Sequence, residues 1–466
     1  MLQVRTGERG KAHESKNKRT LTASIALLTS LVFPKGGLVG KTAAHNPIPA
    51  ITFVSGKCMT DKTQFDLVVY GATSFVGAIT AEYLLSRYGV AGELRWAIAA
   101  RSKTKLADLK DQLGEGAAGL PTIIANSDDE ASLTAMCAQT RLVISTVGPY
   151  ALYGEKLVKV CATSGTHYCD LTGEVQWIAA MLEKYGEAAR ESGALIVNCC
   201  GFDSIPSDLG THFLQNFAEK TTGGTCETVE FGVEAAKGEF SGGTVASLLN
   251  VLKEAGADPS LRKKLADPYL LCPDDYNNSA RQRTEARYYS DALKSWCAPF
   301  VMAGINTRIV QRTNALQGNR YGENFRYSEY TMTGDGLRGR LGSIAMTLGM
   351  GGFMGVLALP PTRWLAEKFL PKPGEGPSKE VQKAGFFKIR LAGTTSSGEV
   401  VSVRVTGDRD PGYGSTAKML AEAGLCILEA AETGKNAGGF WTPASLMGDT
   451  LIERLEANAG LTFEAI

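Results

Sequence analysis

Short apolar runs alternate with amphipathic segments from Asp66 to about Cys200, and this alternation predicts parallel βαβ units. The run Leu67–Tyr70 suits a strand that is covered on both faces, and apolar residues recur at helical spacing in the segment that follows it. Further strands are expected at 95–100, 122–125, 142–146, 168–171 and 194–199, with helices such as 155–162 and 175–191 between them. Right-handed crossovers would join these strands into one Rossmann-type doubly wound sheet, an α/β fold.

From Gly201 onwards the apolar pattern is typical of a second, α+β domain with antiparallel strands. Alternating runs occupy Thr228–Glu234, Phe386–Leu391 and Val400–Val405, and the last two are expected to pair across a glycine-bounded turn. Two helical segments, 415–432 and 443–457, close the chain and are expected to pack back on the first domain. We therefore divide the chain into an extension (1–64), an NAD(P)-binding domain (65–200), an inserted substrate and oligomerisation domain (201–406) and C-terminal helices (407–466).

One apolar segment of the second domain does not resemble an ordinary core element. Leu341–Leu359 is an uncharged run of 19 residues rich in Gly and Met. Its length is close to that of a bilayer span, although its glycines weaken a stable helix. Three interpretations stay open: a surface that contacts membrane or lipid, a buried packing element, and a transmembrane helix, of which the last is the least favoured.

The first candidate site is the turn that directly follows the first strand, and it consists of Gly71, Ala72, Thr73, Ser74, Phe75, Val76 and Gly77. Gly71 permits a tight turn, and Gly77 would let helix and strand approach closely. The first N–H groups of the helix that begins here would then point at a dinucleotide pyrophosphate. Because Thr73 and Ser74 take the place of the usual middle glycine, an ordinary strand-to-helix turn is the alternative.

The end of the second strand indicates which dinucleotide is bound. An acidic residue at this point would accept the ribose hydroxyls of NAD, but this chain has Arg101 and Ser102 there. A guanidinium and a hydroxyl suit the 2′-phosphate of NADP instead. NADP is therefore the expected cofactor, with NAD as the second choice, and a solvated basic loop is the alternative.

The fourth strand ends in a segment that would face the cofactor's reactive ring. Thr146, Gly148, Pro149 and Tyr150 lie where a doubly wound sheet opens towards its ligand. Gly148 allows the backbone to approach a ring closely, Pro149 fixes the exit from the strand, and Tyr150 can pack on the nicotinamide or donate a proton. The alternative is a strand-end turn with a core tyrosine.

Two later strand ends supply carboxyl groups. Asp170 lies at the end of the fifth strand with Glu174 just after it, and Asp203 follows the sixth strand. Burial would raise the pKa of these groups, so Asp170 and Asp203 are candidates for protonating or positioning a substrate. Helix capping is the alternative, with Thr172 capping one helix and Ser204 or Asp203 the next.

Charge and composition narrow the class of protein. Residues 1–58 carry nine Lys or Arg against two Glu, a net of +7, so the remaining 40 basic and 46 acidic residues give a net of −6. A body with this charge gives no reason to expect nucleic acid as a partner. The ten cysteines form no C-x-x-C pair and suit reduced thiols in a reducing compartment, and the four histidines supply no metal site or catalytic triad.

The N-terminal extension differs from the rest of the chain. A basic segment precedes the apolar run Leu21–Phe33, which is too short to span a bilayer comfortably. Its features are shared with signal and transit peptides. A targeting or anchoring segment and a true start at Met59 are the interpretations that stay open.

Taken in order, these segments resemble the saccharopine dehydrogenase-like oxidoreductases, and within them the trans-acting enoyl reductase group of lipid and polyketide metabolism. The resemblance rests on 71–77, 99–102, 146–150, 168–174, 201–208, 314–316, 320–322, 410–414 and 439–444. It covers about 65–464 and implies an NAD(P)-binding domain, an inserted substrate domain and, for some relatives, association with membranes or lipid bodies. It does not imply lysine metabolism, because the amino-acid site of the name-giving enzyme has no residue-by-residue match here.

We therefore expect a cytoplasmic NADPH-dependent oxidoreductase that reduces a double bond in a lipid-linked or polyketide-type substrate. Its expected partners are that small-molecule or lipid substrate, a membrane surface and a second copy of the chain. One rival reduces a C=N bond in an amino-acid conjugate, for which Arg308, Arg312, Arg320 and Arg326 would meet carboxylates. The other is a non-catalytic NADP-binding protein on membranes, in which 341–359 is the working part.

Overall fold

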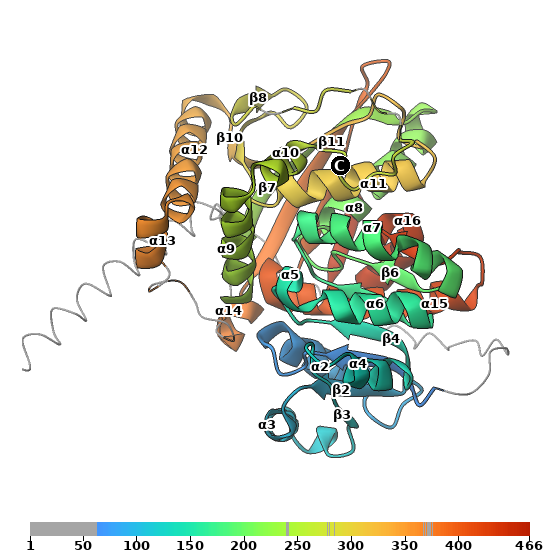
Figure 1. The fold of residues 1–466 in the computed structure, drawn as a ribbon. Coiled ribbons are helices and arrows are strands. Elements are labelled where there is room, and N and C mark those ends of the chain that lie inside the picture. The colour runs from blue at the N-terminus through green and yellow to red at the C-terminus, as the bar shows by residue number, and fades with distance from the viewer. Residues whose placement is uncertain are drawn as a thin grey trace, which may run out of the picture.

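The computed structural model describes residues 63–466 except 239–241, 277, 279, 284, 367, 369, 371–373 and 375. Two seven-stranded sheets form the framework, one parallel and one mixed (Figure 1). The predicted α/β class, a Rossmann-type parallel sheet joined to an α+β part, is confirmed. The interpretations of the N-terminal extension concern residues 1–62, which lie outside the described residues.

The parallel sheet, sheet A, has the order β13-β6-β5-β4-β1-β2-β3. Its strands are β1 Phe65–Tyr70, β2 Trp96–Ala100, β3 Thr122–Ile124, β4 Thr140–Ser145, β5 His167–Asp170, β6 Leu195–Val197 and β13 Gly439–Trp441. The chain runs outwards from β1 in one direction and from β4 in the other, so the crevice between their carboxyl ends is the expected ligand site of this fold. Strand β13 was not predicted, because three residues are too few to show a period.

Helices cover both faces of sheet A because side chains alternate along each strand. Leu67 and Val69 enter one core, and Val68 and Tyr70 enter the other. The first core is covered by α2 Phe75–Tyr88, α3 Lys103–Leu113 and α15 Thr416–Glu432, and the second by α4 Glu130–Cys137, α6 Glu155–Ser164 and α7 Val175–Ser192. The C-terminal helix α15 thus packs beside the first helix of the domain.

The mixed sheet, sheet B, has the order β14-β12-β11-β7-β10-β9-β8. Its strands are β7 Cys226–Lys237, β8 Tyr288–Ser290, β9 Ser295–Pro299, β10 Arg326–Gly334, β11 Phe386–Thr395, β12 Val400–Gly407 and β14 Leu461–Ala465. The predicted hairpin is confirmed, with Leu391 opposite Val403 and Thr394 opposite Val400. Helix α8 Ile205–Thr222 packs on β11 and β12, and α11 Ala303–Leu316 packs on β10. The first core of sheet A therefore continues beneath sheet B.

Eight further α-helices complete the described part of the chain. They are α5 Tyr150–Tyr153, α9 Gly242–Ala257, α10 Pro259–Ala266, α12 Gly336–Ala358, α13 Pro360–Ala366, α14 Lys379–Lys383, α16 Pro443–Leu446 and α17 Gly448–Arg454. The single helix predicted at 443–457 is wrong, because Gly448 has a φ of 44° and separates α16 from α17. Among the described residues one helix, α12, is long enough and apolar enough to cross a membrane, judged by length and composition only.

Candidate functional site

The turn between β1 and α2 requires glycine at both of its ends. Gly71 has a φ of 85°, and a Cβ there would lie 2.6 Å from the Val147 side chain. At Gly77 a Cβ would overlap the carbonyl oxygen of Gly71 and come within 2.7 Å of the Thr146 hydroxyl. The backbone of the turn is therefore drawn against the end of β4, which leaves the start of α2 facing the crevice between β1 and β4.

Two hydroxyl groups hold this turn in place. Thr146 donates to the carbonyl oxygen of Gly71 at 3.0 Å, and its Oγ1 lies 3.0 Å from Ser74 Oγ. Ser74 is the N-cap of α2 and accepts a hydrogen bond from the Gly77 amide. The amides of Phe75 and Val76 belong to the first turn of α2 and have no carbonyl four residues earlier within the helix. They are the groups that a phosphate at this helix N-terminus would meet.

The segment 410–414, which the resemblance had singled out, packs against the same turn. Phe75 and Tyr413 make an edge-to-face contact with ring centroids 5.1 Å apart. Asp410 accepts hydrogen bonds from the amides of Tyr413 and Gly414, which fixes this segment beside α2. Residues from the second half of the chain therefore complete the predicted cofactor turn.

The basic end of β2 is available to solvent. Arg101 is exposed, and no ion pair of Arg101 occurs among the described residues. Ser102 is the N-cap of α3 and accepts from the Lys105 amide at 3.3 Å, so its hydroxyl already has a structural role. The geometry thus leaves Arg101 as the better candidate of the two for a 2′-phosphate.

Gly148 differs from the glycines of the first turn. A Cβ at Gly148 would make only an ordinary contact with the Tyr150 ring, at 3.4 Å, so packing within the protein does not require glycine at this position. We therefore infer that Gly148 is needed for the close approach of another molecule. Pro149, which follows it through a cis peptide bond, is the N-cap of α5.

Tyr150 is buried, and its hydroxyl lies between two backbone groups. It donates to the carbonyl oxygen of Ser145 at 3.0 Å and accepts from the Leu171 amide at 3.4 Å. Its ring packs on Trp177 with centroids 5.4 Å apart. Burial, together with the nearby Asp170 carboxyl, raises the pKa of Tyr150 well above its ordinary value. In this position Tyr150 acts as a link between the ends of β4 and β5, and its proposed catalytic role stays a prediction.

Asp170 has a full set of hydrogen-bond donors. Its carboxyl accepts from the amides of Thr172 and Cys199, the Tyr168 hydroxyl and the Asn198 side chain, at distances between 2.8 and 3.1 Å. Burial raises its pKa to about 6 against the effect of these bonds, which favour the carboxylate. The arrangement ties the ends of β5 and β6 together, so the structure gives Asp170 a structural task.

The predicted helix caps after these strands are different in the structure. Glu174, not Thr172, is the N-cap of α7, and its carboxylate accepts from the amides of Tyr150 and Ala151 at the start of α5. The prediction of Thr172 as the cap is wrong, because the Thr172 hydroxyl instead accepts a hydrogen bond from the Glu174 amide within the turn. Ser204 is the N-cap of α8, as one alternative proposed, but its side chain makes no cap hydrogen bond.

Asp203 is the carboxyl group without a structural task. Among the described residues no group hydrogen-bonds to its side chain, and its pKa is raised to about 7 by burial alone. The residue keeps partial exposure to solvent at the carboxyl end of β6. Its charge acts on both Tyr150 and Cys199, which places it at the same edge of sheet A as the β4 and β5 ends.

A polar network that the sequence did not reveal supports the segment that carries Asp203. Ser204 Oγ donates to Asn306 Oδ1 at 2.8 Å, and Asn306 Nδ2 donates to Glu329 Oε2 at 2.9 Å. Tyr327 donates to the other Glu329 oxygen at 2.6 Å. Burial raises the pKa of Glu329 to about 7. Ser204 lies 102 positions before Asn306, and Asn306 lies 23 positions before Glu329, so the fold and not a local motif brings them together.

Helix α9 lies over the same edge of sheet A. Ser247 donates to Glu174 Oε1 at 2.9 Å, and Thr244 lies 3.4 Å from the Tyr413 hydroxyl. One helix therefore touches both the segment beside the glycine turn and the segment after β5.

The arginines that the C=N rival requires are used elsewhere. Arg308 donates to the carbonyl oxygens of Gly304 and Leu265, and Arg312 to those of Leu271 and Phe440. Arg320 pairs with Glu219. Three of the four side chains thus already have partners within the protein, which removes most of the support for a carboxylate-binding cluster.

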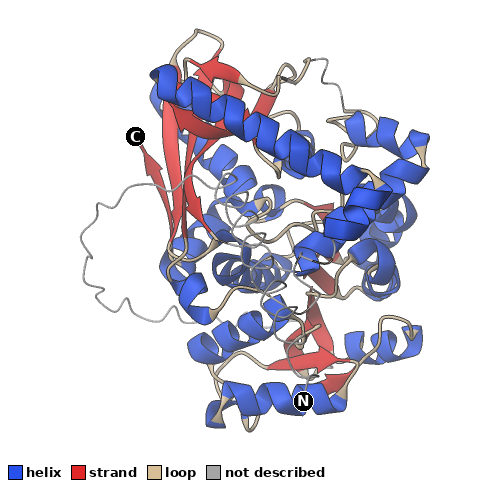
Figure 2. Cartoon of the chain, turned by 90° about the vertical axis from the view of Figure 1, so that its left-hand side faces the viewer, coloured by secondary structure: helices blue, strands red, loops and turns tan. Residues whose placement is uncertain are grey.

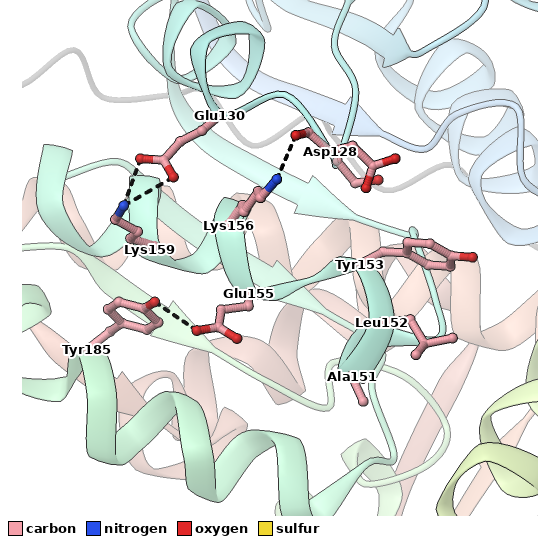
Figure 3. A pocket seen from close by; sticks show the side chains of 10 residues that line it. Asp128, Glu130, Ala151, Leu152, Tyr153, Glu155, Lys156, Lys159 and Tyr185 are labelled. Atoms are coloured by element: carbon pink, nitrogen blue, oxygen red, sulfur yellow. Dashed lines mark hydrogen bonds and ion pairs between the residues drawn. The ribbon is translucent and has the colours of Figure 1, made fainter.

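A surface pocket of about 350 Å³ opens beside α5 and α6 (Figure 3). Its lining includes Leu152 and Tyr153, together with charges that already have partners: Lys159 contacts Glu130, and Tyr185 contacts Glu155 (Figure 3). None of the predicted site residues lines it. The candidate site is therefore the cluster at the carboxyl edge of sheet A.

Comparison with known proteins gives the same cofactor. Residues 67–197 match the family model described as the saccharopine dehydrogenase NADP binding domain. This span contains the glycine turn, Arg101 and the ends of β4 and β5. The residues fit the group: two glycine positions draw the backbone into a cradle that a Cβ would fill, and an exposed arginine follows β2.

Sequence relatives cover nearly the whole chain. A Mycobacterium tuberculosis protein is 40% identical over 414 residues, 86% of this chain and 97% of its own length. A trans-acting enoyl reductase of Mycobacterium bovis is 38% identical over 84% of this chain and 96% of its own length, and one of Mycobacterium ulcerans is 36% identical over the same shares. The apo saccharopine dehydrogenase (L-Glu forming) of Saccharomyces cerevisiae is 12% identical, with a TM-score of 0.47 over 86% of this chain and 100% of that one. The chain is thus an NADP-dependent oxidoreductase, and it belongs to the trans-acting enoyl reductase family of saccharopine dehydrogenase-like proteins.

Proposed function

We propose that this protein reduces a carbon–carbon double bond conjugated to a carbonyl group, in a lipid-linked or polyketide-type acyl substrate. The names of its relatives point to an enoyl substrate. The observation that carries the proposal in this chain is Asp203, a partly buried carboxyl group that has no hydrogen-bond partner among the described residues and lies at the edge of sheet A. Such a group can supply the proton that this reduction needs.

The cofactor residues follow from the geometry. The turn Gly71–Gly77 would hold the pyrophosphate, Arg101 the 2′-phosphate, and Thr146 to Pro149 would lie beside the nicotinamide. When bound there, NADPH supplies a hydride. The protein's own part is to orient the acyl chain and to exclude water from the crevice.

Asp203 would complete the reduction. A hydride added to the carbon remote from the carbonyl leaves the electron pair of the double bond at the neighbouring carbon, which then takes a proton. A pKa of about 7 keeps a large share of Asp203 protonated at neutral pH, and a general acid is most effective when its pKa is near the working pH. Tyr150 and Asp170 are less suited, because backbone and side-chain groups already occupy their oxygens.

The network behind Asp203 supports this assignment. Ser204, Asn306 and Glu329 hold the start of α8 without contacting the Asp203 carboxyl, so the acid is kept in place while its oxygens stay available.

We also propose that the protein works in the cytoplasm. The nine cysteines of the described residues are all free thiols, which fits a reducing compartment.

The direct test is reduction of a medium-chain enoyl thioester with NADPH in which deuterium replaces the hydrogen that is transferred as hydride. We expect consumption of one NADPH per product, with deuterium at the carbon remote from the carbonyl and a solvent proton at the neighbouring one. The corresponding saturated thioester is the control and should consume none. Binding of NADPH without turnover, or turnover only with an imine formed from a keto acid and an amine, would contradict the proposal.

A further inference from the structure

One face of α12 is apolar and uncovered. Its outer stripe consists of Leu337, Leu341, Ala345, Leu348, Gly352, Val356 and Leu359, which follow one another in steps of three or four residues. Leu337 and Leu348 are each 71% exposed, and Leu359 at the end of the helix is 59% exposed. Figure 2 shows α12 as the long helix that crosses the side of the molecule facing the viewer. Apolar side chains at this spacing form a continuous surface that needs a cover.

The opposite side of α12 is held by the protein. Ser343, Met346 and Leu357 are buried, and the helix packs on β9, β10 and α9. A Cβ at Gly339 would overlap the carbonyl of Gly334, so the start of the helix lies directly on the end of β10. A helix that crossed a bilayer would have to leave all these contacts. The structure therefore keeps α12 flat on the body of the protein, although its composition satisfies the test for a spanning helix.

The charges within and beside the outer stripe are mostly basic. From Gly336 to Ala366 the chain has Arg338, Arg340 and Arg363, and the acidic residues nearest in sequence are Asp335 directly before this span and Glu367 directly after it. Beyond the stripe, Trp364 is 61% exposed, and the ammonium group of Lys368 lies 3.5 Å from the centre of its ring. An exposed tryptophan and basic side chains at the ends of an apolar helix are residues that anchor proteins at a membrane interface.

A second copy of this chain fits the stripe less well. If two α12 helices paired in antiparallel fashion, Arg338 and Arg340 of each would face Arg363 and Lys368 of the other. A parallel pair would set the same arginines against each other. In both arrangements like charges meet around an apolar contact, whereas an anionic surface would neutralise them and cover the leucines together.

We propose that α12 and α13 form a docking surface for an anionic lipid bilayer, with α12 lying in the plane of the interface. The leucines of the outer stripe enter the acyl region, and the arginines at both ends contact lipid phosphates. Docking is independent of the reaction. Its consequence for substrate delivery rests on the proposed function: α12 contacts α9, and α9 reaches Glu174 and Tyr413 at the edge of sheet A. An acyl chain that left the bilayer at α12 would meet α9 before the site.

The test is flotation of the full chain with vesicles of equal parts phosphatidylcholine and phosphatidylglycerol, compared with vesicles of phosphatidylcholine alone. We expect binding to the anionic vesicles, and a loss of at least about tenfold in bound fraction when Leu341→Glu and Leu348→Glu are combined. Combining Arg338→Gln with Arg340→Gln should weaken binding about fivefold for each arginine at low salt. Val400→Glu, at a 49% exposed position of β12, is the matched control and should bind normally.

Four further measurements decide between the outcomes: NADPH binding, the thermal midpoint, the oligomeric state and alkaline extraction. NADPH binding and the thermal midpoint of the double glutamate variant should match those of the parent, which shows that the variant is folded and that docking fails separately from the reaction. Unchanged vesicle binding by that variant would overturn the proposal, because a segment other than α12 would then be the one that contacts the vesicles. It would also be overturned if the parent were a dimer that the glutamates make monomeric, or if the parent resisted alkaline extraction from membranes as a spanning protein does.

Discussion

Replacing Asp203 with Asn should stabilise the fold while it impairs the reaction. The ordinary carboxyl pKa of 3.8 is raised at Asp203 to about 7, and burial is the whole cause. One pKa unit corresponds to about 1.4 kcal/mol, so the ionised Asp203 destabilises the folded state by about 4 kcal/mol at most. The partial exposure of the residue makes the true figure smaller. Because Asn cannot ionise, Asp203→Asn removes this term.

The pH dependence has a definite sign. Between pH 3.8 and pH 7 the unfolded chain has lost the Asp203 proton and the folded chain has kept it, so the stability of the parent falls as pH rises through this range. The advantage of Asp203→Asn should therefore be near zero at pH 4, grow up to pH 7 and stay constant above it. For a chain of this length about 1 kcal/mol changes the thermal midpoint by about 1 °C, so we expect a gain of at most about 5 °C at pH 8.

Asp208 provides the matched control. It is fully buried and its pKa is also raised to about 7, but its carboxyl accepts hydrogen bonds from the Thr313 hydroxyl and the Ala444 amide. Asp208→Asn turns an amide donor towards one of these groups and should lower the thermal midpoint at every pH. Opposite effects at two carboxyls whose pKa values are raised to about 7 alike would show that hydrogen-bond partners distinguish them.

The assays are thermal unfolding from pH 4 to pH 8 and steady-state reduction of the enoyl thioester. Asp203→Asn should lower kcat about 10²- to 10⁴-fold if it removes the proton donor, with NADPH affinity unchanged. A fall in the thermal midpoint at pH 8 would refute the reasoning, because it would mean that the carboxylate is held by bonds the fold needs. Full kcat with increased stability would refute only the catalytic assignment.

Three further substitutions test other parts of the structure. Arg101→Asp should weaken NADPH binding about 10- to 100-fold and leave NADH binding nearly unchanged, measured by cofactor fluorescence; equal effects on both would remove the phosphate assignment. Gly77→Ala should prevent folding, whereas Gly148→Ala should fold with a normal thermal midpoint and bind NADPH more weakly; normal folding of the first would contradict the close contact in the turn. Glu422→Gln should lower the free energy of unfolding by about 2 kcal/mol in urea, because Arg454, paired with it at 2.8 Å, loses a buried partner.

The arrangement of sheet A could be predicted from local pattern because its strands are short apolar runs and its helices lie between them in the chain. β13 could not, because Gly439–Trp441 joins β6 only after the chain has passed through the whole second part. Sheet B was recognised as antiparallel from its alternating runs, yet its parallel pair, β7 with β10, depends on a connection of almost ninety residues. Non-local pairing of this kind leaves no period in the sequence.

The cofactor turn was predictable for a similar reason. Gly71 and Gly77 are close in sequence, and their effect is local: one takes a positive φ and the other allows α2 to approach β1. The role of Thr146 could be predicted only in part. Its position at a strand end was evident from the sequence, but its hydrogen bonds to Ser74 and the Gly71 carbonyl depend on the pairing of β1 with β4.

The three strand-end candidates for proton transfer looked alike in the sequence, and the direction of their pKa shifts does not separate them. Asp170 and Tyr150 are buried and Asp203 is partly exposed, yet the pKa of each is raised, with burial as the largest cause. Donors distinguish them: four reach Asp170 and, among the described residues, none reaches Asp203. Stability alone favours the satisfied group or an apolar residue, so a buried carboxyl left without donors at a ligand-binding edge is a cost that a function has to explain. For that reason the measured sign of the Asp203→Asn stability change bears directly on catalysis, even before a natural substrate is at hand.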